Sequence, residues 1–198
     1  MHLISALYHH WLGFVIILYV SMFWLCFNVI FPIEYHFLGE SSAIASLIFL
    51  PHAVRVLSSW LLGPKALFAL IPAEIITHTI WGLEYTSYQS YLIPIFSASS
   101  AVLAFESLRI MGYRIYPSQY HKPNWIGVIV AGVLASIFNS LSGAYLKSEA
   151  FAKEDFIEII ARYIIGDTTG LILSMIMLMY FFRFVDMRTT TLSKRAMN

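Results

Sequence analysis

Charged residues are scarce in this sequence of 198 residues. Asp, Glu, Lys and Arg together make up 12% of the chain, against roughly a quarter in ordinary soluble domains. The formal net charge is only +1, and no cluster of Lys and Arg resembles a phosphate-binding patch. We therefore expect no nucleic acid partner.

Cysteine is almost absent as well. The one cysteine, Cys26, lies within an apolar segment, so the sequence offers no disulfide framework and no cysteine-based metal or redox motif. Glu74 and His78 could supply two metal ligands from one helix face, but the H-E-x-x-H motif is missing. Haem ligation by His52 and His78 is conceivable, whereas no Ser, His and Asp pattern indicates nucleophilic catalysis. We predict no metal site and no enzymatic activity, and the sequence leaves any cofactor unknown.

Long apolar runs dominate the rest of the chain. Hydrophobic residues make up 59% of it and the mean hydropathy is +0.74, which is typical of an integral membrane protein. A helix needs about 20 apolar residues to cross hydrocarbon, and it pairs its backbone groups internally. We predict an all-α, polytopic membrane bundle, with one transmembrane domain over residues 1–184 and a short cytoplasmic tail over 185–198. Six spans are predicted, at approximately 12–31, 41–62, 64–82, 91–110, 124–146 and 159–184.

The positions of Lys and Arg predict the orientation, because cations that flank spans are retained in the cytoplasm. If the N-terminus lies inside, the cytoplasmic side holds Lys65, Arg109, Arg114, Lys122, Arg183, Arg188, Lys194 and Arg195. The opposite side then carries more acidic than basic residues, so we expect both termini in the cytoplasm and membrane lipids as partners. Glu106 and Arg109, three residues apart in the fourth span, are expected to form a local ion pair.

Five ionisable residues fall inside the predicted spans. They are His52 and Arg55 in the second span, Glu74 and His78 in the third, and Asp167 in the sixth. Because a helix rises about 1.5 Å per residue, most of them share a middle-to-outer layer. A charge at the bilayer centre costs a few kcal/mol, so such groups face the bundle interior and find partners. We predict that they line a polar cavity that binds a ligand. The plainer alternative is a structural ion pair of Arg55 with Glu74 or Asp167.

Prolines accompany two of these residues. Pro51 directly precedes His52, and Pro72 lies two residues before Glu74. A proline inside a helix frees the carbonyl four residues earlier, and that carbonyl needs a neighbour, a water molecule or a ligand. We therefore expect helices broken at Pro51 and Pro72.

The fifth predicted span carries small residues at every fourth position, the spacing of a ridge for helix contact. These residues are Gly132, Ser136 and Ser140. Asn139, beside them, is expected either to join two helices through a hydrogen bond or to donate to a ligand.

Two stretches of the chain carry a family pattern, FLPHAVRVLSSWLLGPKALFALIPAEIITHTIWG and IEIIARYIIGDTTGLILSMIMLMYFFRF. They resemble the bacterial membrane-associated sensor domain family (MASE type, first class). The matching residues are Pro51, Leu61, Leu62, Gly63, Pro72, Gly166, Asp167 and Gly170. The resemblance covers about residues 45–184, and His52 and Ala73 depart from it where the pattern has glycine. It implies structural roles for Pro51, Pro72, Gly63, Gly166 and Gly170.

The resemblance also implies a function and a location. Such a module perceives a small signal or a membrane state, lies in the bacterial inner membrane, and is usually joined to a cytoplasmic cyclase, phosphodiesterase or histidine kinase. This sequence ends soon after the last predicted span, so we expect it to act through a separate partner protein.

Three functions stay open from the sequence. The first is a non-catalytic sensor or ligand-binding module for a small molecule or a proton. The second is a small-solute transporter or a substrate-capture subunit like those of vitamin importers, because polar groups at mid-membrane depth are typical of transport sites. The third is a structural or assembly subunit of a larger membrane complex, for which 15 Phe and 12 Tyr offer ample surface.

Overall fold

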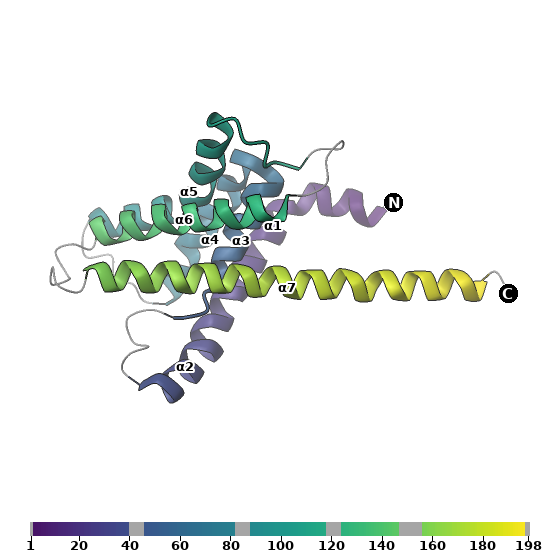
Figure 1. Ribbon diagram of the computed structural model, residues 1–198, viewed down its shortest axis with the longest axis horizontal. Coiled ribbons are helices and arrows are strands. Elements are labelled where there is room, and N and C mark those ends of the chain that lie inside the picture. Colours follow the sequence, from purple (N-terminus) through teal and green to yellow (C-terminus); the bar gives the residue numbers. More distant parts are fainter. Residues whose placement is uncertain (1, 40–45, 82–87, 118–123, 147–155, 197–198) are drawn as a thin grey trace.

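The computed structural model describes residues 2–39, 46–81, 88–117, 124–146 and 156–196, which are almost entirely helical (Figure 1). No strand occurs among these residues, and the predicted all-α class is confirmed. The elements in chain order are α1 (His2–Leu25), the π-helix η1 (Cys26–Ile30), α2 (Phe31–Leu38), α3 (Leu50–Leu62), the 3₁₀-helix η3 (Gly63–Ala66), α4 (Leu67–Ile80), α5 (Tyr88–Ile110), α6 (Trp125–Leu146) and α7 (Phe156–Ala196).

Five stretches of the described residues are long and apolar enough to cross a membrane. They are His10–Leu38, Leu50–Ile80, Leu92–Ile110, Trp125–Gly143 and Ile160–Phe184. This is the pattern of a multi-pass membrane protein. The predicted spans 41–62 and 64–82 meet in the single stretch Leu50–Ile80. Residues 46–49 and 81 lie outside this stretch, and residues 41–45 and 82 lie outside the described part of the chain. The count of six spans stays a prediction.

The stretch Leu50–Ile80 reverses direction at η3. Arg55 Nη1 lies 3.6 Å from Glu74 Oε1, whereas a straight helix over the same residues would separate their Cα atoms by roughly 28 Å. Gly63 permits the reversal because its φ is +60°, a conformation that residues with a Cβ rarely accept. Pro64 follows in the first turn of η3, where its missing N–H is not needed. α3 and α4 therefore form a helical hairpin, and α1 and α5 each pack against both of its arms.

The chain enters α3 through a non-helical segment, residues 46–49, that lies directly on α7. The Phe49 N–H donates to the Gly166 carbonyl at 3.0 Å. A Cβ at Gly166 or at Gly170 would collide with the carbonyl of Ser46 or of Phe49. The two glycines of α7 thus allow a backbone-to-backbone approach that no other residue type permits.

The structure corrects two expectations at this place. Of the predicted span 41–62, residues 46–49 are not helical, and the helix begins only at Leu50. Pro51 occupies the first turn of α3, where it starts a helix instead of breaking one. Pro72 lies in the interior of α4, which runs unbroken from Leu67 to Ile80, so neither proline breaks its helix. The late start of α3 accompanies the contact of residues 46–49 with α7, which sequence reasoning did not anticipate.

Polar groups of the first helical segment satisfy the irregular backbone before α3. The Leu47 N–H donates to Glu34 Oε2 at 3.1 Å, and the Leu50 N–H donates to Cys26 Sγ at 3.3 Å. Non-helical backbone at membrane depth is tolerated only where protein supplies such partners. Cys26 therefore caps the start of α3.

α3 is the central helix of the bundle. Ten of its thirteen residues are buried, and it packs against α1, α5, α6 and α7. Val54 belongs to a core cluster with α1, α4 and α5, whereas Val56 and Trp60 belong to a second cluster with α5, α6 and α7. A helix enclosed in this way must bury its polar side chains with its apolar ones.

α6 and α7 lie side by side along the long axis of the molecule (Figure 1). α7 is one helix of 41 residues, and it extends well past the N-terminal end of α6. The predicted tail over 185–198 therefore continues the helix as far as Ala196. In Figure 1 the N- and C-terminal ends point to the same side of the molecule.

Candidate functional site

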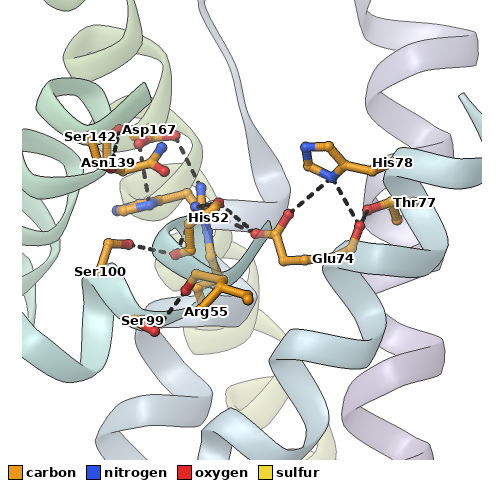
Figure 2. A network of polar contacts seen from close by, with 12 residues as sticks. His52, Arg55, Glu74, Thr77, His78, Ser99, Ser100, Asn139, Ser142 and Asp167 are labelled. Atoms are coloured by element: carbon orange, nitrogen blue, oxygen red, sulfur yellow. Dashed lines mark hydrogen bonds and ion pairs between the residues drawn. The ribbon is translucent and has the colours of Figure 1, made fainter. Parts of the chain in front are cut away.

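α3 carries two ionisable side chains into the centre of the bundle. His52 and Arg55, three residues apart on one helix face, are 0% and 1% exposed. Figure 2 shows them between Glu74 of α4 and Asp167 of α7. Both carboxylates are equally buried, at 1% exposure each. Four ionisable groups from three helices therefore meet where water has almost no access.

The Arg55 guanidinium links the two carboxylates. Its Nη1 lies 3.6 Å from Glu74 Oε1 and its Nη2 lies 3.7 Å from Asp167 Oδ1. Its Cζ lies 5.8 Å from the centre of the Phe49 ring, which is within the range of a cation–π interaction. Arg55 Nε has no hydrogen-bond partner among the described residues. The cation is thus held by charge on two sides and by an aromatic face on a third.

Ser97 of α5 supplies hydrogen bonds between the opposite charges. Arg55 Nη1 donates to the Ser97 hydroxyl and also to the Ser97 carbonyl, the latter at 3.3 Å. The Ser97 hydroxyl in turn donates to Glu74 Oε1 at 2.7 Å. The Ser100 hydroxyl donates to the same Ser97 carbonyl at 2.8 Å. One serine therefore connects the guanidinium to the carboxylate and ties α5 to the hairpin.

His52 and Asp167 form the part of the network that faces α6. His52 Nε2 lies 3.1 Å from the Gly132 carbonyl, and because a carbonyl only accepts, Nε2 carries a proton. His52 Nδ1 lies 3.3 Å from Asp167 Oδ2. That same oxygen accepts a hydrogen bond from the Ser136 hydroxyl at 2.9 Å. The histidine thus has a fixed orientation between a backbone carbonyl and a carboxylate.

His78, Thr77 and Tyr19 surround the Glu74 end of the network. The Glu74 carbonyl accepts from His78 Nδ1 and from the Thr77 hydroxyl, both at 2.9 Å. His78 Nδ1 also lies 3.6 Å from Glu74 Oε2. Tyr19 of α1, 1% exposed, has a side-chain hydrogen bond with Glu74. The network, which we name the buried network, thereby reaches α1, α3, α4, α5, α6 and α7.

The charges of the buried network do not balance. With both histidines neutral, Arg55 contributes one positive charge, whereas Glu74 and Asp167 contribute two negative charges. An uncompensated buried charge costs several kcal/mol, because the low-dielectric interior cannot solvate it. The arrangement therefore calls for one further positive charge.

The structure brings together five of the six candidate residues, namely His52, Arg55, Glu74, His78 and Asp167. Asn139 lies half-buried on α6, three residues after Ser136, and its backbone carbonyl accepts from the Ser142 hydroxyl at 3.0 Å. Figure 2 shows the Asn139 side chain near Asp167. The alternative interpretation, an ion pair of Arg55 with Glu74 or Asp167, is also compatible with the structure, because Arg55 contacts both carboxylates.

Tyr19 is one participant that sequence reasoning missed. The first predicted span consists mostly of apolar and aromatic residues. Within it, Val15, Tyr19 and Phe23 follow one another at every fourth position, and all three are buried. A tyrosine on the buried stripe of a membrane helix needs a partner for its hydroxyl. The spacing of this stripe was therefore the signal that could have found it.

A second ionic cluster lies at the end of α5, and we name it the peripheral pair. Arg109 Nη2 contacts Glu106 Oε2 three residues earlier in the same helix, as expected. The Tyr116 hydroxyl donates to Glu106 Oε1 at 2.8 Å. Burial, followed by the hydrogen bond and the charge of Glu106, raises the pKa of Tyr116 well above its ordinary value.

No protein-family model, no curated protein and no solved structure matches the chain. The resemblance to the MASE-type sensor family therefore stays a prediction that rests on its quoted residues. Within the described residues, no group of three or more His, Cys, Asp and Glu side chains is arranged to hold a metal ion. The argument for function thus depends on the buried network.

Proposed function

We propose that this protein is a non-catalytic sensor module of the bacterial inner membrane, which passes the state of the buried network to a separate partner protein. The observation that carries this proposal is the charge imbalance among Arg55, Glu74 and Asp167 at about 1% exposure. Intramembrane ionisable residues are functional candidates by default. A purely structural pair needs one cation and one anion, and the extra carboxylate leaves a place for a signal.

The network is suited to transmit what it receives. Its hydrogen bonds and ion pairs join α3 to α4, α5, α6 and α7. A change of one charge therefore alters the interactions of several helices at once. Coupling between sites typically amounts to about 1–3 kcal/mol, which is within the energy of one buried ionic contact. α7, which carries Asp167 and continues beyond the bundle, is the natural element to report the change.

We propose six crossings with both termini in the cytoplasm. The α3–α4 hairpin supports an even number, because its two arms run in opposite directions and divide the single stretch Leu50–Ile80 into two crossings. Near the η3 turn, the Trp60 indole N–H donates to the Ile115 carbonyl at 2.8 Å. This end of the bundle therefore gathers Lys65, Arg109 and Arg114, as a cytoplasmic end should.

The test compares the partner proteins that charge variants retain after extraction from the cell membrane. Full-length wild type, Asp167→Asn and Arg109→Gln are purified in mild detergent, and the bound proteins are identified and quantified by mass spectrometry. We expect Asp167→Asn to change the amount of a retained partner at least several-fold and Arg109→Gln to leave it unchanged. Identical partner profiles in all three correctly inserted proteins would end the sensor proposal. A partner retained equally by every variant would instead favour an assembly subunit.

A transporter is the second candidate, and the break in the chain before α3 favours it. Transport sites are typically built where discontinuous helices meet polar groups at mid-membrane depth, and residues 46–49 bring such a break to Asp167. Uptake of radiolabelled small solutes into proteoliposomes tests this candidate. Saturable uptake by wild type that Asp167→Asn abolishes would replace the sensor reading.

A further inference from the structure

The contact between His52 and Asp167 is chemically incomplete in the neutral form. His52 Nε2 donates its proton to the Gly132 carbonyl at 3.1 Å, so in a neutral imidazole Nδ1 carries only a lone pair. That lone pair faces Asp167 Oδ2 at 3.3 Å, and Nδ1 has no hydrogen-bond partner among the described residues. Two acceptors in contact repel each other. A proton between them turns the contact into a hydrogen bond.

The charge imbalance of the buried network requires the same proton. The groups that face this pair are Arg55 on α3, Glu74 on α4 and Tyr19 on α1, together with the Ser97 and Ser136 hydroxyls. With His78, which contacts Glu74, counted as neutral, only Arg55 is cationic, and it is shared between two carboxylates. One added proton at His52 and Asp167 brings the sum to zero. Geometry and charge, two independent observations, therefore lead to the same atoms.

The geometry at these atoms indicates a hydrogen bond. Among the described residues, no group of three or more His, Cys, Asp and Glu side chains is arranged to hold a metal ion, and His52 Nδ1 lies 3.3 Å from Asp167 Oδ2. The observed separation is close to that of an N–H···O hydrogen bond. The site has the dimensions for a proton.

We infer that the buried network binds one exchangeable proton between His52 Nδ1 and Asp167 Oδ2, and that this proton is the signal which the module reads. The inference rests on the proposed function and names its ligand. Binding transfers one proton from water to the pair, and release returns it to water. No other atom or electron changes place. In the protonated state His52 bridges α6 and α7, and in the deprotonated state the contact between α3 and α7 becomes repulsive.

The experiment titrates the isolated full-length protein in lipid nanodiscs, without a partner and with H⁺ as the only ligand. Infrared difference spectra with isotope-labelled histidine are recorded in sodium-free buffer over about pH 5 to 8, where a histidine most readily exchanges its proton. Wild type is expected to show one titrating signal that Asp167→Asn and His52→Gln both remove. The glutamine keeps an amide that can donate to the Gly132 carbonyl. Arg109→Gln, which removes one charge from the peripheral pair, should leave the signal intact.

Glu74→Gln gives a second, independent arm. It removes one negative charge from the network without touching His52 or Asp167, so Arg55 and Asp167 balance each other. Proton binding is then expected to weaken at least tenfold, with the titration moved to lower pH by at least about one unit. This arm keeps the test valid if Asp167→Asn reduces helix content or alters elution in size-exclusion chromatography.

Several outcomes would overturn the inference. A titrating signal that survives in both Asp167→Asn and His52→Gln places the proton elsewhere. An unmoved midpoint in Glu74→Gln means that the charge sum does not govern binding. Spectra that respond to Na⁺ but not to pH assign the site to a metal cation. The proposed function fails separately: a normal titration combined with an unchanged partner profile in Asp167→Asn leaves the proton site in place and removes its sensory role.

Discussion

Arg55 and Arg109 both pair with a glutamate, but they differ in everything that surrounds the pair. The Arg109 side chain is 63% exposed and contacts Glu106 within its own helix. The Arg55 side chain is 1% exposed and contacts carboxylates of two other helices. Water and salt compete with the peripheral pair and screen it. The buried network has no such competitor, so each of its charges depends on the others.

The comparison teaches that the same chemical pair can be nearly dispensable or indispensable. An exposed ion pair contributes about 0–1 kcal/mol, because water solvates each partner when the other is removed. Removal of one partner from a buried pair leaves an uncompensated charge and costs about 3–5 kcal/mol. The experiments below test that difference, beginning with the largest expected effect.

Arg55→Leu should destabilise the protein far more than Arg109→Leu. The first variant leaves Glu74 and Asp167 buried without a cation, for an expected loss of about 3–5 kcal/mol, whereas the second should lose no more than about 1 kcal/mol. Unfolding in mixed micelles, followed by circular dichroism, measures both. Equal losses in the two variants would mean that the buried network is solvated after all.

Gly170→Ala should disturb the buried network without changing any charge. The added methyl group collides with the Phe49 carbonyl, and such overpacking costs about 1–3 kcal/mol. Gly143→Ala is the matched control, because its Cβ meets no atom within 4 Å and alanine favours the helix. The same unfolding assay applies. A Gly170→Ala protein as stable as the control would show that α3 does not depend on this contact.

A double-mutant cycle sharpens the contrast at the level of pairs. Arg55 and Asp167, replaced singly by leucine and asparagine and then together, should show a coupling of about 1–3 kcal/mol. The equivalent cycle on Arg109 and Glu106 should give about 0.3–0.5 kcal/mol, and this coupling should shrink in high salt. Salt-sensitive coupling at Arg55 would contradict its isolation from water.

The smallest effect concerns Tyr116 at the peripheral pair. Its pKa is raised above the ordinary 10.0, so above about pH 10 the unfolded chain releases a proton that the folded chain keeps. Stability is therefore expected to fall as the pH rises from about 10. Tyr116→Phe should lose about 1 kcal/mol at neutral pH with its hydrogen bond and should show a shallower alkaline decline. Alkaline unfolding curves of the two proteins that stay parallel would argue against this role.

Much of the candidate site could be predicted from the sequence, because ionisable residues in apolar helices have few alternatives to meeting each other. His52, Arg55, Glu74, His78 and Asp167 were identified because they are ionisable residues inside predicted apolar spans. The bridging roles of Ser97, Ser136 and Tyr19 were not, since hydroxyl groups on a membrane helix are equally suited to close packing. Only the relative rotation of the helices distinguishes the two roles.

The sequence by itself determined the all-helical class, the presence of apolar helices long enough to span a membrane, and the local Glu106–Arg109 pair. Each of these depends on composition or on neighbours a few residues apart, which covalent geometry fixes. Only the tertiary structure decided that residues 46–49 leave the helix and that Arg55 serves two carboxylates at once. The contact of this segment with Gly166 and Gly170 joins parts of the chain more than a hundred residues apart. Long-range packing sets such contacts, and no local pattern encodes them.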